Sequence, residues 1–193
     1  GEEPTDEAVH VDIWVSGRRY GGVKSDPHVP QDMDVVITLD RDGDTPIGDP
    51  SKDRMSDVLG QRVTELHDGF CEGMRYKTAF SNNQTGLRCA MRNGLRDLFK
   101  CVEDQKRDYR KESSRPGKRT RGKVKAYIGC KSGRHRAVML ANEAAKALRK
   151  KGATVKLHFV GSMWRGNVDT AGHREDRGPC GCHIHASLCQ FKP

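Results

Sequence analysis

Residues 124–159, VKAYIGCKSGRHRAVMLANEAAKALRKKGATVKLHF, place a helical pattern between two short runs of alternating apolar and polar residues. The first run, 124–128, alternates with period two and stops at a glycine, which is typical of a β-strand, and the second run, 155–159, alternates in the same way. Between them we expect a helix from about Gly133 to Lys151. One apolar stripe defines it: Ala137, Val138, Ala141, Ala144, Ala145 and Leu148. This strand–helix–strand order predicts a right-handed parallel crossover.

Segments farther out carry compatible patterns. Residues 9–15 alternate as a strand, and residues 34–39 are β-branched and almost all apolar, so we expect the latter to be a central strand covered on both faces. A polar loop is expected at 40–53, and helices at 56–66 and from Thr85 through Val102. The predicted fold class is α/β, a small mostly parallel or mixed sheet flanked by helices, with an irregular C-terminal tail.

The 193 residues suit one domain with short appendages. We predict a disordered acidic tail at 1–8, the α/β domain at 9–160, and an irregular tail rich in Cys and His at 161–193. Residues 105–123 hold nine Lys and Arg against two Asp and Glu and have almost no apolar side chains, so we expect a mobile basic segment. No run reaches the ~18 apolar residues of a membrane span, so no membrane partner is expected.

The net charge of +9 is unevenly distributed, because residues 1–53 hold 13 Asp and Glu against 5 Lys and Arg. The rest of the chain is therefore strongly basic, which favours an anionic partner, nucleic acid first, over a merely soluble surface. Seven cysteines without a secretory signal indicate the cytoplasm or another reducing compartment. A lost targeting segment is left open.

The loop at 129–136 combines three features that favour an anion. Its glycines let the backbone turn and approach a ligand, and the helix that follows contributes unpaired N–H groups with a partial positive charge. Lys131, Arg134 and Arg136 add full charges. We predict binding of a phosphorylated small molecule; a basic turn packed against acidic neighbours is the alternative. The expected ligand-binding residues are Cys130, Lys131, Ser132, Gly133, Arg134, His135 and Arg136.

A catalytic alternative uses the same loop. Cys130 and Arg136 have the Cys-x5-Arg spacing of cysteine-dependent phosphatases, in which a thiolate attacks a phosphate held by backbone amides and an arginine. Asp40, Asp42 or Asp44 would have to serve as the general acid. We expect binding without chemistry and keep this phosphatase as the rival function.

The loop also resembles a known family. Gly129-Cys-Lys-Ser-Gly-Arg-His-Arg-Ala137 is similar to the Gly-Cys-Thr-Gly-Gly-Lys-His-Arg-Ser of the C-terminal domains of RapZ-like RNase adapter proteins. Upstream, Gly17 to Gly21, Pro30 to Asp34 and Val35 to Arg41 resemble that family's Lys-Tyr-Gly, Pro-x-Asp-Ala-Asp and Asp-Val-Arg segments, and Asp49-Pro50 stands where it has Asn-Pro.

The resemblance implies a non-catalytic adaptor domain that binds glucosamine 6-phosphate and small RNAs. It assigns the phosphosugar site to Cys130, Ser132, Gly133, His135 and Arg136. This chain departs from the pattern where Lys131-Ser132 replaces Thr-Gly and where Leu39-Asp40-Arg41 replaces Asp-Val-Arg, so the sugar is left open. No Walker-type nucleotide-binding loop is found.

Two further segments carry binding hypotheses. A basic arm beside the phosphate-binding face would contact an RNA backbone through Arg115, Lys118, Arg119 and Arg121. Alternatively, the chain is a structural component of a nucleoprotein assembly held by that arm. In the tail, Cys180, Cys182 and Cys189 with nearby histidines make zinc the candidate cofactor, against free thiols or a redox pair. The oligomeric state is left open.

Overall fold

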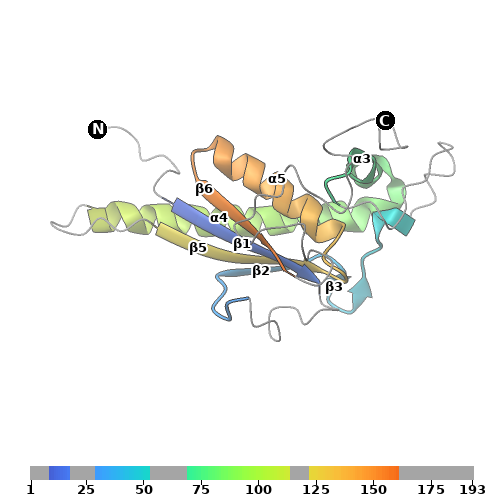
Figure 1. Ribbon diagram of the computed structural model, residues 1–193, viewed down its shortest axis with the longest axis horizontal. Helices are drawn as coiled ribbons and strands as arrows, with labels where there is room; N and C mark the ends of the chain where they lie inside the picture. The colour runs from blue at the N-terminus through green and yellow to red at the C-terminus, as the bar shows by residue number, and fades with distance from the viewer. Residues whose placement is uncertain (1–8, 18–28, 53–68, 114–121, 161–193) are drawn as a thin grey trace.

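The computed structural model describes residues 9–17, 29–52, 69–113 and 122–160 (Figure 1). Four strands form one sheet in the order β2-β5-β1-β6, and all three pairings are parallel. The strands are β1 (Val9–Gly17), β2 (Val35–Thr38), β5 (Gly122–Cys130) and β6 (Thr154–Phe159). A separate two-stranded hairpin follows β2, formed by β3 (Arg41–Asp42) and β4 (Thr45–Pro46). The predicted α/β class is confirmed.

Helices cover one face of this sheet. They are α4 (Thr85–Ser113) and α5 (Arg136–Lys150), while α3 (Glu72–Phe80) packs against α4 and the 3-10 turns are η3 (Pro50–Lys52) and η4 (Asn82–Gln84). Helices α4 and α5 run along the strands (Figure 1) and share one apolar core with them. Their close approach is visible at Gly94 of α4, where an added Cβ would lie 2.8 Å from Ile37 Cγ2 and 3.3 Å from Leu140 Cδ2.

The two central strands supply the floor of the core. In β1, Val9, Val11, Ile13 and Val15 are fully buried, while the residues between them are half-buried. This is the period-two pattern of a strand with one face packed and the other partly open to solvent. The alternation from which β1 was predicted thus reflects the burial of every second side chain on one face of the strand.

The crossover from β5 through α5 to β6 matches the prediction closely. Helix α5 ends in a Schellman motif: Gly152 N–H donates to the carbonyl of Arg149, and Ala153 N–H to that of Leu148. The helix begins at Arg136, three residues later than expected, because Gly133 has a φ of +71° and cannot be its first turn. Strand β5 extends beyond 124–128 at both ends.

Three expectations differ from the structure. Strand β2 is an edge strand of the described sheet, not a central one, and its Val36 is 56% exposed. The expected polar loop at 40–53 contains the β3–β4 hairpin, turned at Gly43. Helix α3 was not expected from the sequence at all, whereas the helix expected at 56–66 lies outside the described residues.

The described parts of the basic segment have regular structure. Helix α4 continues to Ser113 and β5 begins at Gly122, so the ends of the expected mobile segment 105–123 are a helix and a strand. The charged residues are good helix formers, and Lys106 and Arg107 pair with Glu103 and Asp104 one turn earlier. None of the described helices, including the long but highly charged α4, has a stretch apolar enough to cross a membrane.

Candidate anion-binding site

The loop of residues 131–135 lies at the carboxyl ends of the two central strands. It leaves β5 after Cys130, and β1 ends beside it, since Gly17 pairs with Cys130 in the parallel register. Helix α5 then starts at Arg136, so its amino end faces the same edge of the sheet. Ligands of open parallel sheets bind at this edge, where the strands end and helices begin.

The loop packs backbone to backbone against the end of β1. A Cβ on Gly133 would lie 2.6 Å from Gly17 N, and one on Gly17 would lie 2.4 Å from the carbonyl carbon of Ser132. No larger residue fits either place without moving main chain, and Gly133 also needs its positive φ of +71°. The path of the loop is therefore fixed by two glycines in contact.

The side chain of Cys130 supports this turn. Its side chain is buried, and its Sγ accepts a hydrogen bond of 3.2 Å from the backbone N–H of Gly133. In the described structure the sulfur is thus part of the support of the loop. The same bond would also suit a thiolate, so the geometry of Cys130 alone does not separate binding from phosphatase chemistry.

His135 and Asp49 form a buried pair behind the loop. The His135 Nδ1 lies 2.9 Å from Asp49 Oδ2, and their side chains are 5% and 15% exposed. Ser51 N–H donates to Asp49 Oδ1 at 2.8 Å. Burial alone would raise the pKa of Asp49, but the hydrogen bonds and the interaction with His135 outweigh it and hold that pKa well below its usual range. Because an ionised carboxylate only accepts hydrogen bonds, Nδ1 of His135 carries the proton.

Arg136 is turned toward the same segment. Its side chain is 5% exposed, its Nη1 donates to the carbonyl of Ile47, and its Nη2 lies 4.0 Å from Asp49 Oδ2. The Nε has no hydrogen-bond partner among the described residues. Arg136 therefore ties the start of α5 to residues 47–49.

The remaining predicted residues are the ones that solvent reaches. Lys131 is exposed, and Ser132 and Arg134 are half-buried. Beside them, at the end of β1, Ser16 is fully buried and its Oγ has no hydrogen-bond partner in the described part of the chain. The structure thus divides the predicted set into buried supporting groups, Cys130, Gly133, His135 and Arg136, and an accessible group, Lys131, Ser132 and Arg134.

Sequence reasoning missed two supports of this site. Gly69 donates its N–H to the carbonyl of Arg134, and a Cβ at Gly69 would lie 2.3 Å from the carbonyl oxygen of His135. Nothing in the local pattern around Gly69 points to this contact. Asp49 did carry a signal, because Asp49-Pro50 was among the segments that resembled the family, but its pairing with His135 was not foreseen.

The basic arm is anchored away from this loop. The arm joins the end of α4 to the start of β5 at Gly122, whereas the loop follows the other end of β5 at Cys130 (Figure 1). The two anchor points are separated by nine strand residues, roughly 26 Å at about 3.3 Å per residue. Both described ends of the arm thus lie away from the loop, and the expectation that the arm lies beside the phosphate-binding face stays a prediction, because residues 114–121 fall outside the described residues.

Other predicted sites fall outside the described residues. Arg115, Lys118, Arg119 and Arg121 lie in 114–121, and Cys180, Cys182 and Cys189 in 161–193. Within the described ranges, no group of three or more His, Cys, Asp or Glu side chains could hold a metal ion. The RNA-binding and zinc hypotheses thus stay predictions.

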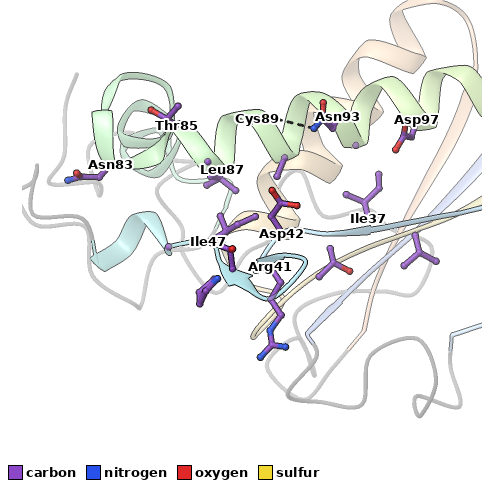
Figure 2. A pocket seen from close by; sticks show the side chains of 18 residues that line it. Ile37, Arg41, Asp42, Ile47, Asn83, Thr85, Leu87, Cys89, Asn93 and Asp97 are labelled. Atoms are coloured by element: carbon purple, nitrogen blue, oxygen red, sulfur yellow. Dashed lines mark hydrogen bonds between the residues drawn. The ribbon is translucent and has the colours of Figure 1, made fainter.

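A cavity of about 490 Å³ lies next to the segment that Arg136 holds, between β2, the β3–β4 hairpin and α4 (Figure 2). Ile47 and Gly48 line it on the side of the loop. The cavity and the loop are therefore neighbours that share one supporting segment.

Comparison with known proteins agrees with the resemblance found in the sequence. Residues 89–160 match the family described as the RapZ C-terminal domain. This range holds most of α4 together with β5, the loop, α5 and β6, and so includes every predicted ligand-binding residue. No curated protein matches the chain.

Proposed function

We propose that this chain is a non-catalytic adaptor domain that captures the phosphate group of a phosphosugar or nucleotide-like metabolite at the loop of residues 131–135. One observation carries the proposal: the amino end of α5 and two accessible cations, Lys131 and Arg134, meet at the carboxyl edge of the central strands. A phosphate placed there would satisfy helix N–H groups and balance the positive charge at one point.

The loop is suited to binding because its shape is set in advance. The contact between Gly17 and Gly133 and the buried pair of His135 with Asp49 hold the backbone before any ligand arrives. A site that need not reorganise loses less free energy on binding. The buried Ser16 Oγ and Arg136 Nε, which have no partner within the described residues, supply further polar groups beside the loop.

The test removes the accessible cations and leaves the support intact. In Lys131→Ala/Arg134→Ala we expect the affinity for glucosamine 6-phosphate and for inorganic phosphate, measured by isothermal titration calorimetry, to fall about tenfold or more, since a hydrogen bond to a charged group contributes about 1.5–3 kcal/mol. Lys123→Ala, an exposed lysine at the far end of β5, is the matched control and should bind as the parent does.

Equal affinity in the double variant and the control would overturn the proposal. So would a parent protein that binds neither probe at millimolar concentration. If inorganic phosphate binds but glucosamine 6-phosphate does not, the site takes a different phosphorylated molecule, and nucleotides are the next probes.

The phosphatase alternative is separated by turnover. The Arg136 guanidinium donates to Ile47 and lies near Asp49, so it serves as an anchor, and this favours binding over catalysis. We expect no turnover of an aryl phosphate above that of Cys130→Ser, and similar phosphate affinity in both proteins. Turnover that disappears in Cys130→Ser would instead establish the enzyme.

RNA is the proposed second partner. The basic segment between α4 and β5 would contact the phosphate backbone without reading bases, and an adaptor would thereby couple a metabolite at one end of β5 to RNA at the other. The chain composition supports this, because the strong positive charge is concentrated outside residues 1–53.

A further inference from the structure

The cavity of about 490 Å³ forms a groove between the edge strand β2 and helix α4 (Figure 2). Its walls come from β2, the hairpin and the first half of α4. The lining residues used below are Val36, Thr38, Asp42, Gly86, Asn93 and Asp97.

The strand side of the groove offers main-chain hydrogen-bonding groups. Among the described strands β2 pairs only with β5, and Leu39 N–H donates to Gly129 O at 2.8 Å on that side. Backbone groups in a strand alternate in direction, so those of Val36 and Thr38 point away from β5. They form the open edge of the sheet, and an extended chain adds to such an edge.

The helix side leaves room for another chain. Helix α4 approaches β2 closely at Gly94, whereas at Gly86, which lines the cavity about two turns earlier, an added Cβ would meet nothing within 4 Å. On the strand side Ile37 supplies the apolar side chain that faces α4, whereas the 56% exposed side chain of Val36 points to the other face of the sheet. The groove thus combines an open backbone edge with an apolar contact.

The charge of the groove is opposite to that of the chain. Asp42 and Asp97 are exposed and line it, against Arg41 as the one lining cation among the described residues. Farther along the same helix the Cys101 thiol is half-buried, and burial, with Asp34 and Asp104 nearby, raises its pKa. An acidic rim in a chain of net charge +9 selects a basic occupant.

We infer that this groove binds an extended basic segment of a partner protein, which adds to β2 as a fifth strand. Its backbone pairs with Val36 and Thr38, every second side chain enters the space beside α4, and Lys or Arg side chains meet Asp42 and Asp97. This surface is separate from the phosphate loop, so the inference does not depend on the proposed function.

The experiment selects ligands directly. A displayed library of random decapeptides is panned against the full chain and counter-selected against Asn93→Trp, which places a large side chain in the groove from an exposed position. Arg96→Trp, exposed on α4 but outside the groove lining, is the matched control. We expect peptides rich in Lys and Arg with β-branched residues at alternate positions.

The selected peptide is then measured by fluorescence anisotropy. Asn93→Trp should weaken it about tenfold or more by filling the groove, and Arg96→Trp should stay within about twofold of the parent. Asp42→Asn/Asp97→Asn should weaken it about three- to tenfold, as expected for two exposed ion pairs. Peptide binding should also slow hydrogen exchange at the Val36 and Thr38 amides.

Three outcomes overturn the inference. In the first, the selection yields no peptide whose binding is weakened by Asn93→Trp. In the second, the selected peptides are acidic or have no β-branched residues at alternate positions. In the third, peptide binding leaves the hydrogen exchange of the Val36 and Thr38 amides unchanged. A dimer by sedimentation that Asn93→Trp dissociates would show that the occupant is a second copy of this chain, and would equally refute a foreign partner.

Discussion

Asp49 holds the buried side of the loop together, since it accepts hydrogen bonds from both His135 and Ser51. Replacing it by Asn keeps the shape but removes the charge and turns one of the two accepting oxygens into an NH2 donor, so only one of the hydrogen bonds from His135 and Ser51 can be kept. We expect Asp49→Asn to lower the free energy of unfolding at pH 7 by about 1–3 kcal/mol. Urea denaturation checks this value, with the exposed Asp44→Asn as the control within about 0.5 kcal/mol of the parent.

The same pair predicts a pH dependence. The pKa of Asp49 is lowered in the folded protein, so its contribution to stability is complete above the unfolded pKa of about 4 and is lost as the pH falls through the folded value. The gap between parent and Asp49→Asn should therefore be widest from about pH 5 upward and shrink below about pH 4. A gap that stays constant down to pH 3 would show that the charge of Asp49 is not involved.

Gly133 and Gly43 allow steric contact to be separated from backbone strain. Both have positive φ, +71° and +59°, but an added Cβ is 2.6 Å from Gly17 N at Gly133 and meets nothing within 4 Å at Gly43. We expect Gly43→Ala to cost about 1 kcal/mol and Gly133→Ala about 2–4 kcal/mol in the free energy of unfolding. Equal costs would contradict the backbone contact of the loop with β1.

Among the elements, those with a regular local pattern were predictable. The alternation of β1, β5 and β6 and the stripe of α5 follow from which side chains face the core, and local sequence shows this directly. Gly152, which ends α5 in a Schellman motif, follows this stripe directly, as a C-terminal cap glycine does. The anion loop could be located for the same reason, since it is the junction of two regular elements.

Elements that depend on distant packing were not predictable. The apolar run of β2 was interpreted as a buried central strand, yet the sheet order leaves it at the edge, and sheet order is set by contacts far apart in the sequence. Helix α3 has no clear apolar stripe, and its Lys77 is fully buried. Asp49 and Gly69 contact the loop only because the tertiary structure brings them there, so the sequence around them does not predict these contacts.

The junction of α4 and β2 gives a test at this scale. At Gly94 an added Cβ would lie 2.8 Å from Ile37 Cγ2, so Gly94→Ala should destabilise the protein by about 1–2 kcal/mol although Ala favours helix. In an Ile37→Ala background, which removes the clashing methyl group, the same change should stabilise. Gly86→Ala, with open space around it, should stabilise in both backgrounds. Additive effects in this double-mutant cycle would refute the contact.

At the scale of the whole molecule, one proposed anion site precedes β5 in the sequence and the other follows it, so the two should be separable. Replacing Arg115, Lys118, Arg119 and Arg121 by Ala should weaken single-stranded RNA binding and reduce the slope of log K against log salt by up to about 2.8. Phosphate affinity at the loop should stay unchanged. Filter binding over a salt series and calorimetry measure the two effects.

The reciprocal variant completes the comparison. Lys131→Ala/Arg134→Ala should lose phosphate affinity while its RNA salt slope stays near that of the parent. If either variant removes both activities, the two anions share one surface and the arrangement along β5 has no functional meaning.

The place of β1 in the sheet has a consequence for how the protein is made. This strand is the first of the described strands in sequence, yet it lies between β5 and β6, and its Val9 pairs with Gly122, more than one hundred residues later. During synthesis the apolar side chains of β1 lack both neighbouring strands until β5 and β6 have also been synthesised. Such distant pairing slows folding and exposes an aggregation-prone strand, so chaperone dependence of the nascent chain is the expected cost of this topology.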